Sequence, residues 1–126
     1  MLKALTVAGL LAASMALPIA PRSQAAQIMV DGRGAAKCSV VTSDYKARPT
    51  AVANDMMGWA YGYMTRRNFE RAASGKVQVN LQTDKFGPVE MVSLMLKFCE
   101  ENPDVRYYSA VDALFELLAQ DQGLTS

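Results

Sequence analysis

The stretch that decides the fold is PTAVANDMMGWAYGYM, residues 49–64. Pro49 opens it, and proline suits the first position of a helix because the N–H that it lacks has no intrahelical partner there. Six apolar residues follow at offsets of 4, 7, 8, 11 and 12 from the first: Val52, Met56, Trp59, Ala60, Tyr63 and Met64. Such offsets place side chains on one helical face, so the pattern predicts an amphipathic helix over about 49–69.

Two glycines lie four residues apart inside this predicted helix, Gly58 and Gly62. A glycine in a helix interior costs about 1 kcal/mol relative to alanine. We therefore expect another backbone to approach the helix closely at these positions.

A second helix is predicted over 88–101. Pro88 follows Gly87, and one face carries Val89, Val92, Leu96 and Cys99. Asn102 and Pro103 end this helix, and the same pair suits the cap and first turn of a third. The third helix has an apolar set of its own: Val105, Tyr108, Val111, Leu114, Phe115 and Leu118.

The remaining segments fill in an all-α fold: a small single-domain bundle of three main helices in residues 38–119. A flexible arm is expected over 26–37, a short helix near 43–48 and a frayed tail over 120–126. The alternating residues Val77 to Leu81 have no visible partner strand, so 70–86 is predicted to be an extended loop.

Residues 1–25 have the order of a secretion signal. Lys3 precedes an apolar run from Ala4 to Leu17, and a small-x-small site ends at Ala25. The run is short and is broken by Pro18, which favours a cleaved signal peptide over an uncut membrane anchor. We therefore expect a mature protein that is exported to the periplasm and has no membrane segment.

Cys38 and Cys99 are the only two cysteines of the chain. In an oxidising compartment an even number of cysteines is expected to form disulfides. The sequence thus predicts one bridge, closing a loop of roughly sixty residues and contributing about 4 kcal/mol through chain entropy.

Charge and composition weigh against several function classes. Two of the 13 basic side chains, Lys3 and Arg22, lie in the leader, which leaves 11 basic and 12 acidic side chains. This balance favours neither nucleic acid nor an anionic membrane as a partner. The basic group Arg66, Arg67 and Arg71 is interpreted as a solvated helix end. The chain has no histidine, the commonest general base and metal ligand, so neither an enzyme nor a metal or cofactor site is expected.

Three fragments together resemble the HdeA/HdeB family of periplasmic acid-stress chaperones. They are Cys38, the segment Trp59-Ala60-Tyr61-Gly62-Tyr63, and Phe98-Cys99-Glu100-Glu101-Asn102-Pro103 before an apolar helix. The resemblance covers about 38–119. It implies a chaperone that works without ATP, is a folded homodimer at neutral pH, and exposes apolar surface to hold unfolding clients in acid. Without histidine, an acid response must come from carboxylates.

A second function class stays open, a periplasmic immunity or inhibitor protein that neutralises a secreted toxin. Four residues are expected on a core or partner face: Trp59, Gly62, Tyr63 and Tyr108. Trp59 and Tyr63 are favoured as core, with Trp59 mostly buried against the second and third helices. Tyr107 and Tyr108 are adjacent and cannot both face one core, so one of them should be exposed or in an interface.

Overall fold

The longest element is α2 (Pro49–Ala73), which begins at the predicted proline and runs four residues beyond the predicted end. The structure, a computed structural model, describes residues 30–124. It adds η1 (Gly32–Ala35), a short 3-10 helix, and three further α-helices, α1 (Cys38–Ala47), α3 (Pro88–Glu101) and α4 (Tyr107–Asp121). Over these residues the all-α fold is confirmed, and the helix count is corrected from three main helices to four.

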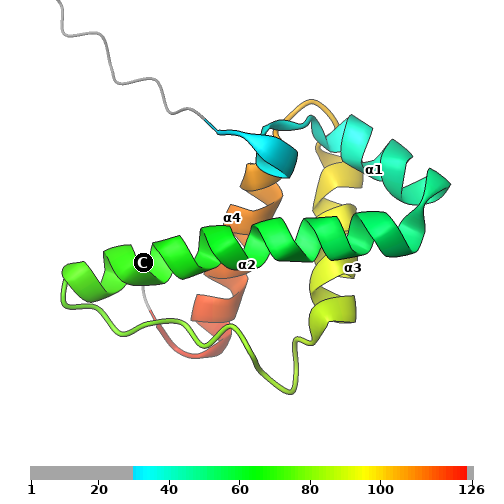
Figure 1. The fold of residues 1–126 in the computed structure, drawn as a ribbon. Helices are drawn as coiled ribbons and strands as arrows, with labels where there is room; N and C mark the ends of the chain where they lie inside the picture. Colours follow the sequence, from blue (N-terminus) through cyan, green and yellow to red (C-terminus); the bar gives the residue numbers. More distant parts are fainter. Residues whose placement is uncertain (1–29, 125–126) are drawn as a thin grey trace, which may run out of the picture.

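The additional helix is α1, which spans ten residues, whereas only a short helix near 43–48 was expected. A single residue, Arg48, separates α1 from α2. Figure 1 shows α2 lying across α3 and α4, while α1 lies beside the end of α3. The helix α2 is therefore the central element, and the other helices pack against it.

The core lies where α2 crosses α3 and α4. Its largest fully buried side chains include Tyr107, Phe115 and four methionines: Met56, Met64, Met91 and Met95. The flexible thioether side chain of methionine fills irregular gaps between crossing helices well. These methionines thus form the interior rather than a binding surface.

The start of α4 differs from the prediction, because the helix begins at Tyr107 and not at Asn102 or Pro103. Residues 103–106 instead pair with the start of α1. The Cys38 N–H donates to the Val105 carbonyl at 2.8 Å, and the Ser39 N–H donates to the Pro103 carbonyl at 2.9 Å. These carbonyls are used by a distant segment, so the helix starts later.

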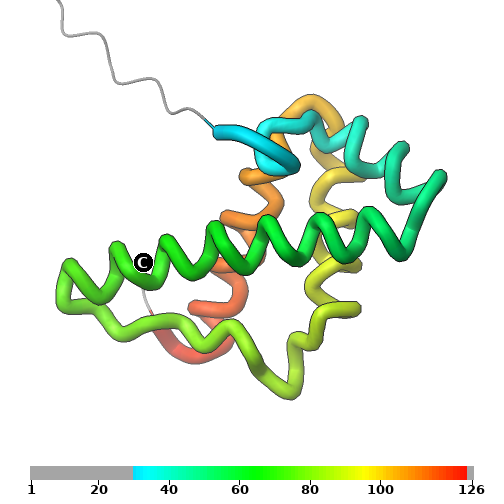
Figure 2. Tube along the Cα trace, viewed as in Figure 1, coloured from blue at the N-terminus to red at the C-terminus, as the bar shows by residue number. Residues whose placement is uncertain are grey.

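The connector, residues 74–87, returns from the far end of α2 to the start of α3 (Figure 2). It contains no strand, as the sequence predicted. In residues 30–124 the only β-type pairing is an isolated antiparallel bridge between Lys37 and Arg106.

The signal peptide expected over 1–25 and its cleavage after Ala25 lie outside the described residues. Within residues 30–124, no helix has both the length and the apolar character that crossing a membrane requires.

Candidate functional site

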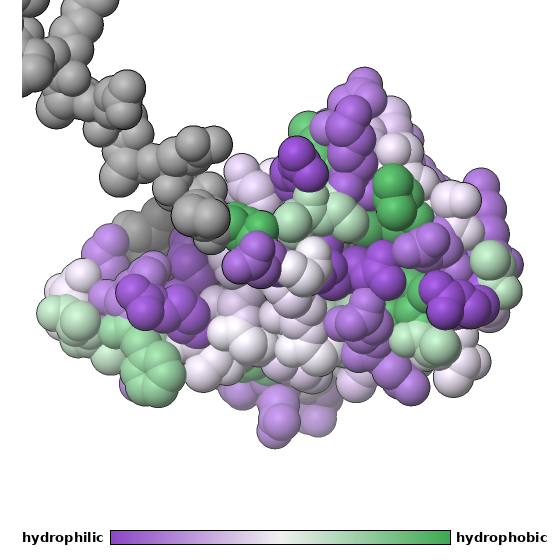
Figure 3. Space-filling view, turned by 45° about the horizontal axis from the view of Figure 1, so that its top comes forward, coloured by the Kyte–Doolittle hydropathy of each residue, from purple (hydrophilic) through white to green (hydrophobic). Residues whose placement is uncertain are grey.

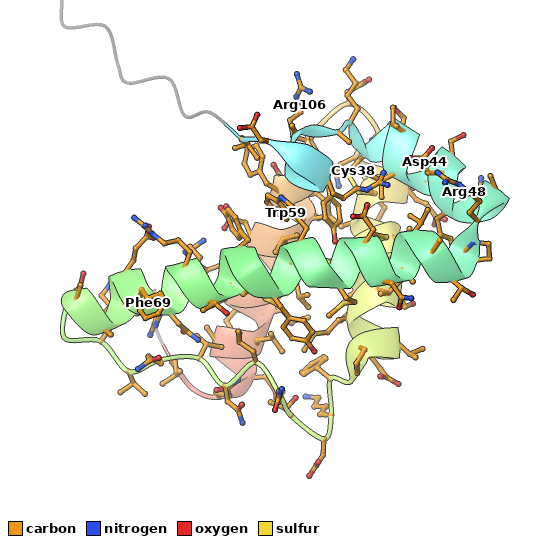
Figure 4. The ribbon with its side chains drawn as sticks, viewed as in Figure 1. Cys38, Asp44, Arg48, Trp59, Phe69 and Arg106 are labelled. Carbon is orange, nitrogen blue, oxygen red and sulfur yellow. A yellow bond between two sulfur atoms is a disulfide. The ribbon has the colours of Figure 1, made fainter. Side chains whose placement is uncertain are left out.

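The predicted disulfide is present between Cys38, the first residue of α1, and Cys99, in the last turn of α3. Both cysteines are fully buried. The bridge joins residues 61 positions apart, so it fastens α1 to α3 by a covalent bond that acid does not break. Figure 4 shows Cys38 above the end of α3.

Of the four residues predicted for a core or partner face, Trp59 and Tyr63 stack on each other. Trp59, Tyr63 and Tyr108 are half-buried, and Gly62 is exposed. A Cβ atom added at Gly62 or at Gly58 would meet no atom within 4 Å. The expectation that another backbone approaches these glycines is therefore wrong for residues 30–124, and both lie on the outer face of α2.

Trp59 packs against the core and meets Tyr107 of α4, as predicted, but part of its cover comes from residues 31–34, which the sequence did not predict. Its indole Nε1 donates a hydrogen bond to the Asp31 carbonyl at 3.1 Å. Its ring stacks on Tyr63 with centroids 5.1 Å apart and meets Tyr107 of α4 at 5.9 Å. Gly34 lies flat against the ring, since a Cβ at Gly34 would be only 1.9 Å from the Trp59 Cζ2 atom.

The segment that covers Trp59 is held by Arg33. Its guanidinium contacts an Asp44 oxygen of α1 at 2.8 Å and an Asp55 oxygen of α2 at 2.6 Å. Burial lowers the pKa of Arg33, but the hydrogen bonds and charges of the two carboxylates outweigh burial and raise it. Residues 32–35, expected to belong to a flexible arm, thus form a short helix tied to both α1 and α2.

A second charged cluster joins α2 to α4. Arg67 pairs with Asp112 and with Glu116, the latter at 2.9 Å, and its guanidinium carbon lies 4.8 Å from the Phe115 ring centroid. The Tyr63 hydroxyl donates to Asp112 at 3.1 Å. Burial and the charge of Asp112 raise the pKa of Tyr63. Arg67 therefore links two helices and is not the solvated cation predicted from the sequence.

Tyr107, rather than Tyr108, is the buried member of the tyrosine pair. Its hydroxyl donates at 3.1 Å to the Met56 carbonyl and lies 3.0 Å from the Met95 sulfur. Desolvation raises the pKa of Tyr107 well above its usual value. The prediction that only one of the two tyrosines faces the core is confirmed.

An open groove runs along α3, between α3, α2 and the end of α1. Its volume is about 720 Å³. Most of its lining is apolar or aromatic: Tyr45, Ala53, Met57, Pro88, Val89, Val92 and Leu96. A few polar groups lie among them: Asn54, Ser93, Lys97 and Glu100. We call this the α3 groove; its size and mixed lining are typical of binding sites.

Val89 marks the most accessible apolar part of the α3 groove, because it is 78% exposed. A second hollow of about 450 Å³ shares Val89 and Ser93 with the groove and extends it toward Phe86. On the face shown in Figure 3, hydrophobic side chains lie among many polar and charged ones. The α3 groove thus offers an open apolar surface with an accessible valine at its edge.

One important residue was missed by the sequence reasoning. Asn68 of α2 is buried, and its side-chain amide accepts from the Val79 N–H and donates to the Val79 carbonyl, both at 2.8 Å. An asparagine in a helix gives no signal of this role, since its partner is a loop backbone.

In residues 30–124 no three His, Cys, Asp or Glu side chains are placed to hold a metal ion. A scan against protein-family models, a search of curated proteins and a search of solved structures each found no match to this chain.

Proposed function

We propose that this protein is a periplasmic, ATP-independent chaperone that holds unfolding proteins at low pH, as its resemblance to the HdeA/HdeB family implies. The observation that carries the proposal is the α3 groove. An open, mostly apolar groove of about 720 Å³ suits several apolar side chains of an unfolded segment. Its few polar groups leave room for clients of varied sequence.

The arrangement of charges supports an acid response. Among the described residues, five ion pairs join segments that are distant in sequence, and each of them needs a carboxylate: Arg33–Asp44, Arg33–Asp55, Arg67–Asp112, Arg67–Glu116 and Lys85–Asp121. Carboxylates have reference pKa values of about 4, so strong acid protonates them and removes these links. The Cys38–Cys99 bridge remains and limits how far the chain opens.

The test measures light scattering of an acid-labile client mixed with the oxidised mature protein, at pH 7 and at about pH 2.5, below carboxylate pKa values. We expect aggregation to be suppressed in acid and little affected at pH 7. Val89→Ser should weaken suppression because it removes an apolar side chain of the groove. Val40→Ser is the matched control, since Val40 is also exposed but lies outside the groove.

Unchanged client aggregation at several-fold excess would contradict the proposal. Together with a protein that stays monomeric at both pH values, it would favour the alternative, an immunity or inhibitor protein that binds a secreted toxin. Size-exclusion chromatography at the two pH values tests the homodimer that the resemblance implies.

A further inference from the structure

Residues 31–36, which we call the strap, cover Trp59, whose ring stacks on Tyr63. The strap approaches Trp59 at Gly34, where no side chain would fit above the ring. Gly32 takes a φ of 68°, a left-handed value that favours glycine, and turns the backbone onto this position. Both glycines therefore favour closure of the strap over Trp59, which is labelled in Figure 4.

The two ends of the strap are held differently. At its C-terminal end, the Tyr107 N–H donates to the Ala36 carbonyl at 2.9 Å, and Arg106 donates to the Ala35 carbonyl. The disulfide at Cys38 lies two residues further on. Its N-terminal end is held only by Arg33 and the indole bond to Asp31 among the side-chain contacts of the described residues. The C-terminal end of the strap is thus anchored by backbone hydrogen bonds near the disulfide, whereas its N-terminal end is held mainly by the ion pairs of Arg33.

The charged groups that face Arg33 determine the pH range in which the N-terminal end of the strap stays in place. These groups are Asp44 from α1 and Asp55 from α2, with the Tyr107 hydroxyl of α4 within electrostatic reach. The cations Lys37 and Arg106 lie at the anchored end, where their backbones pair. Among residues 30–124, Arg33 therefore has two negative partners and no positive one in contact.

The side chain of Arg33 is only 14% exposed, so its charge is largely removed from water. Arginine stays protonated in acid, whereas its two partners become neutral. A largely buried guanidinium without a counter-charge is costly, and the cost is relieved when the group moves into water. Because Arg33 is part of the strap, that movement would carry Gly34 off the tryptophan ring.

We propose that the strap is an acid-released cover: when Asp44 and Asp55 are neutralised, Arg33 swings out and uncovers the Trp59 ring as an aromatic surface for apolar client segments. The assignment of clients rests on the proposed function, whereas the opening itself does not. The surface is separate from the α3 groove, which no part of the strap lines.

Trp59 is the only tryptophan of the chain, so its fluorescence reports on the strap directly. The experiment measures acrylamide quenching and emission of the oxidised mature protein between pH 7 and about pH 2.5, with far-UV circular dichroism in parallel. We expect the quenching constant to rise about twofold or more in acid while most helical signal remains, since only the cover is lost.

Two kinds of variant should open the strap at pH 7. Asp44→Asn combined with Asp55→Asn imitates protonation with little change of shape, and Gly34→Ala places a methyl group where the Trp59 ring lies. Both should show at pH 7 the quenching that the unaltered protein shows in acid. Gly62→Ala is the matched control because its Cβ meets nothing, and it should behave like the unaltered protein.

Quenching that is unchanged in acid, or that rises only in step with loss of the helical signal, would overturn the proposal. If Gly34→Ala does not fold, the double asparagine variant still decides the question, and its unaltered quenching at pH 7 would also overturn it. A strap that opens while client aggregation continues would support this inference and contradict the proposed function.

Discussion

The strap and the connector both lie against α2, but different chemistry holds them. The strap, residues 31–36, depends on the ion pairs of Arg33 with Asp44 and Asp55. The connector, residues 74–87, is held at its centre by neutral amides. Asn68 makes two hydrogen bonds to the Val79 backbone, and Gln122 makes two to the Asn80 backbone.

This difference between ion pairs and neutral amides indicates which parts of the molecule can respond to acid. An amide does not titrate in the accessible pH range, so its hydrogen bonds are the same at pH 7 and in acid. A carboxylate loses its charge, and an arginine facing it loses its partner. The connector also has an ion pair, Lys85–Asp121, but this pair lies near its α3 end. We therefore expect acid to loosen the strap before the middle of the connector.

The largest expected effect comes from the covalent link beside the strap. Cys99→Ser should lower the free energy of unfolding by about 2–5 kcal/mol, as loss of a native bridge does in small domains. The measurement is thermal unfolding at pH 7 and in acid, and Cys38→Ser should match it because the same bridge is lost. A melting temperature unchanged by either variant would contradict the role of the bridge as the acid-proof anchor.

Asn68→Ala tests whether neutral amide hydrogen bonds hold the connector against α2. It leaves the N–H and C=O of Val79 without their partner in a buried place, which should cost about 1–3 kcal/mol. Denaturant unfolding should give the same loss at pH 7 and in mild acid. Asn68→Asp is the informative contrast, because a carboxylate there makes the loss depend on pH. If the loss of stability caused by Asn68→Ala disappears in acid, the connector is not held independently of pH, and the contrast with the strap is wrong.

Tyr107 tests the place where the strap meets the core. Burial raises its pKa above the usual value of about 10, so the folded state holds the proton more tightly than the unfolded state. Its contribution to stability is complete below about pH 10 and is lost as the pH rises further, by about 1.4 kcal/mol per pH unit.

Unfolding measured between pH 9 and 11 should show this slope, and Tyr107→Phe should reduce it. Some slope should remain in the variant, because the pKa of Tyr63 is raised as well. Equal slopes in the two proteins would show that the Tyr107 hydroxyl is not buried as described.

The smallest effect is expected at Arg66, which pairs with Glu70 within α2 at 2.9 Å. This side chain is 74% exposed and joins no separate segment. Exposed pairs of this kind contribute about 0.3–0.5 kcal/mol, so Arg66→Gln should change the melting temperature little. A large loss would show that charge alone, and not the linking of segments, sets the response to acid.

Features of the fold that depend only on neighbouring residues in the chain, or on residue type, could be predicted from the sequence. Pro49 and Pro88 mark the starts of α2 and α3 because proline suits a first turn. The disulfide followed from two cysteines and an expected oxidising compartment. The late start of α4 could not be predicted, since the carbonyls of Pro103 and Val105 accept hydrogen bonds from the start of α1.

The candidate site was harder to predict for the same reason. Trp59 lies on the predicted helical face, but its cover comes from a glycine-containing segment 25 positions earlier, at Gly34. Helical periodicity says which side chains share a face and nothing about a distant backbone that covers them. The α3 groove likewise combines residues of three helices and has no sequence signature of its own.

The most direct test of the account is hydrogen exchange at two protons measured by NMR in one sample. One is the Trp59 indole N–H, bonded to the strap at Asp31, and the other is the Val79 amide N–H, bonded to Asn68. Both are measured at pH 7 and at about pH 2.5 and are corrected for the intrinsic exchange rate of each group.

If acid releases the strap selectively, protection of the Trp59 indole falls about tenfold or more in acid, while protection of the Val79 amide changes by less than about threefold. Equal loss at both protons would mean that acid opens the whole domain at once. Full protection at Trp59 in acid would mean that the strap does not open, and either result would contradict selective release of the strap.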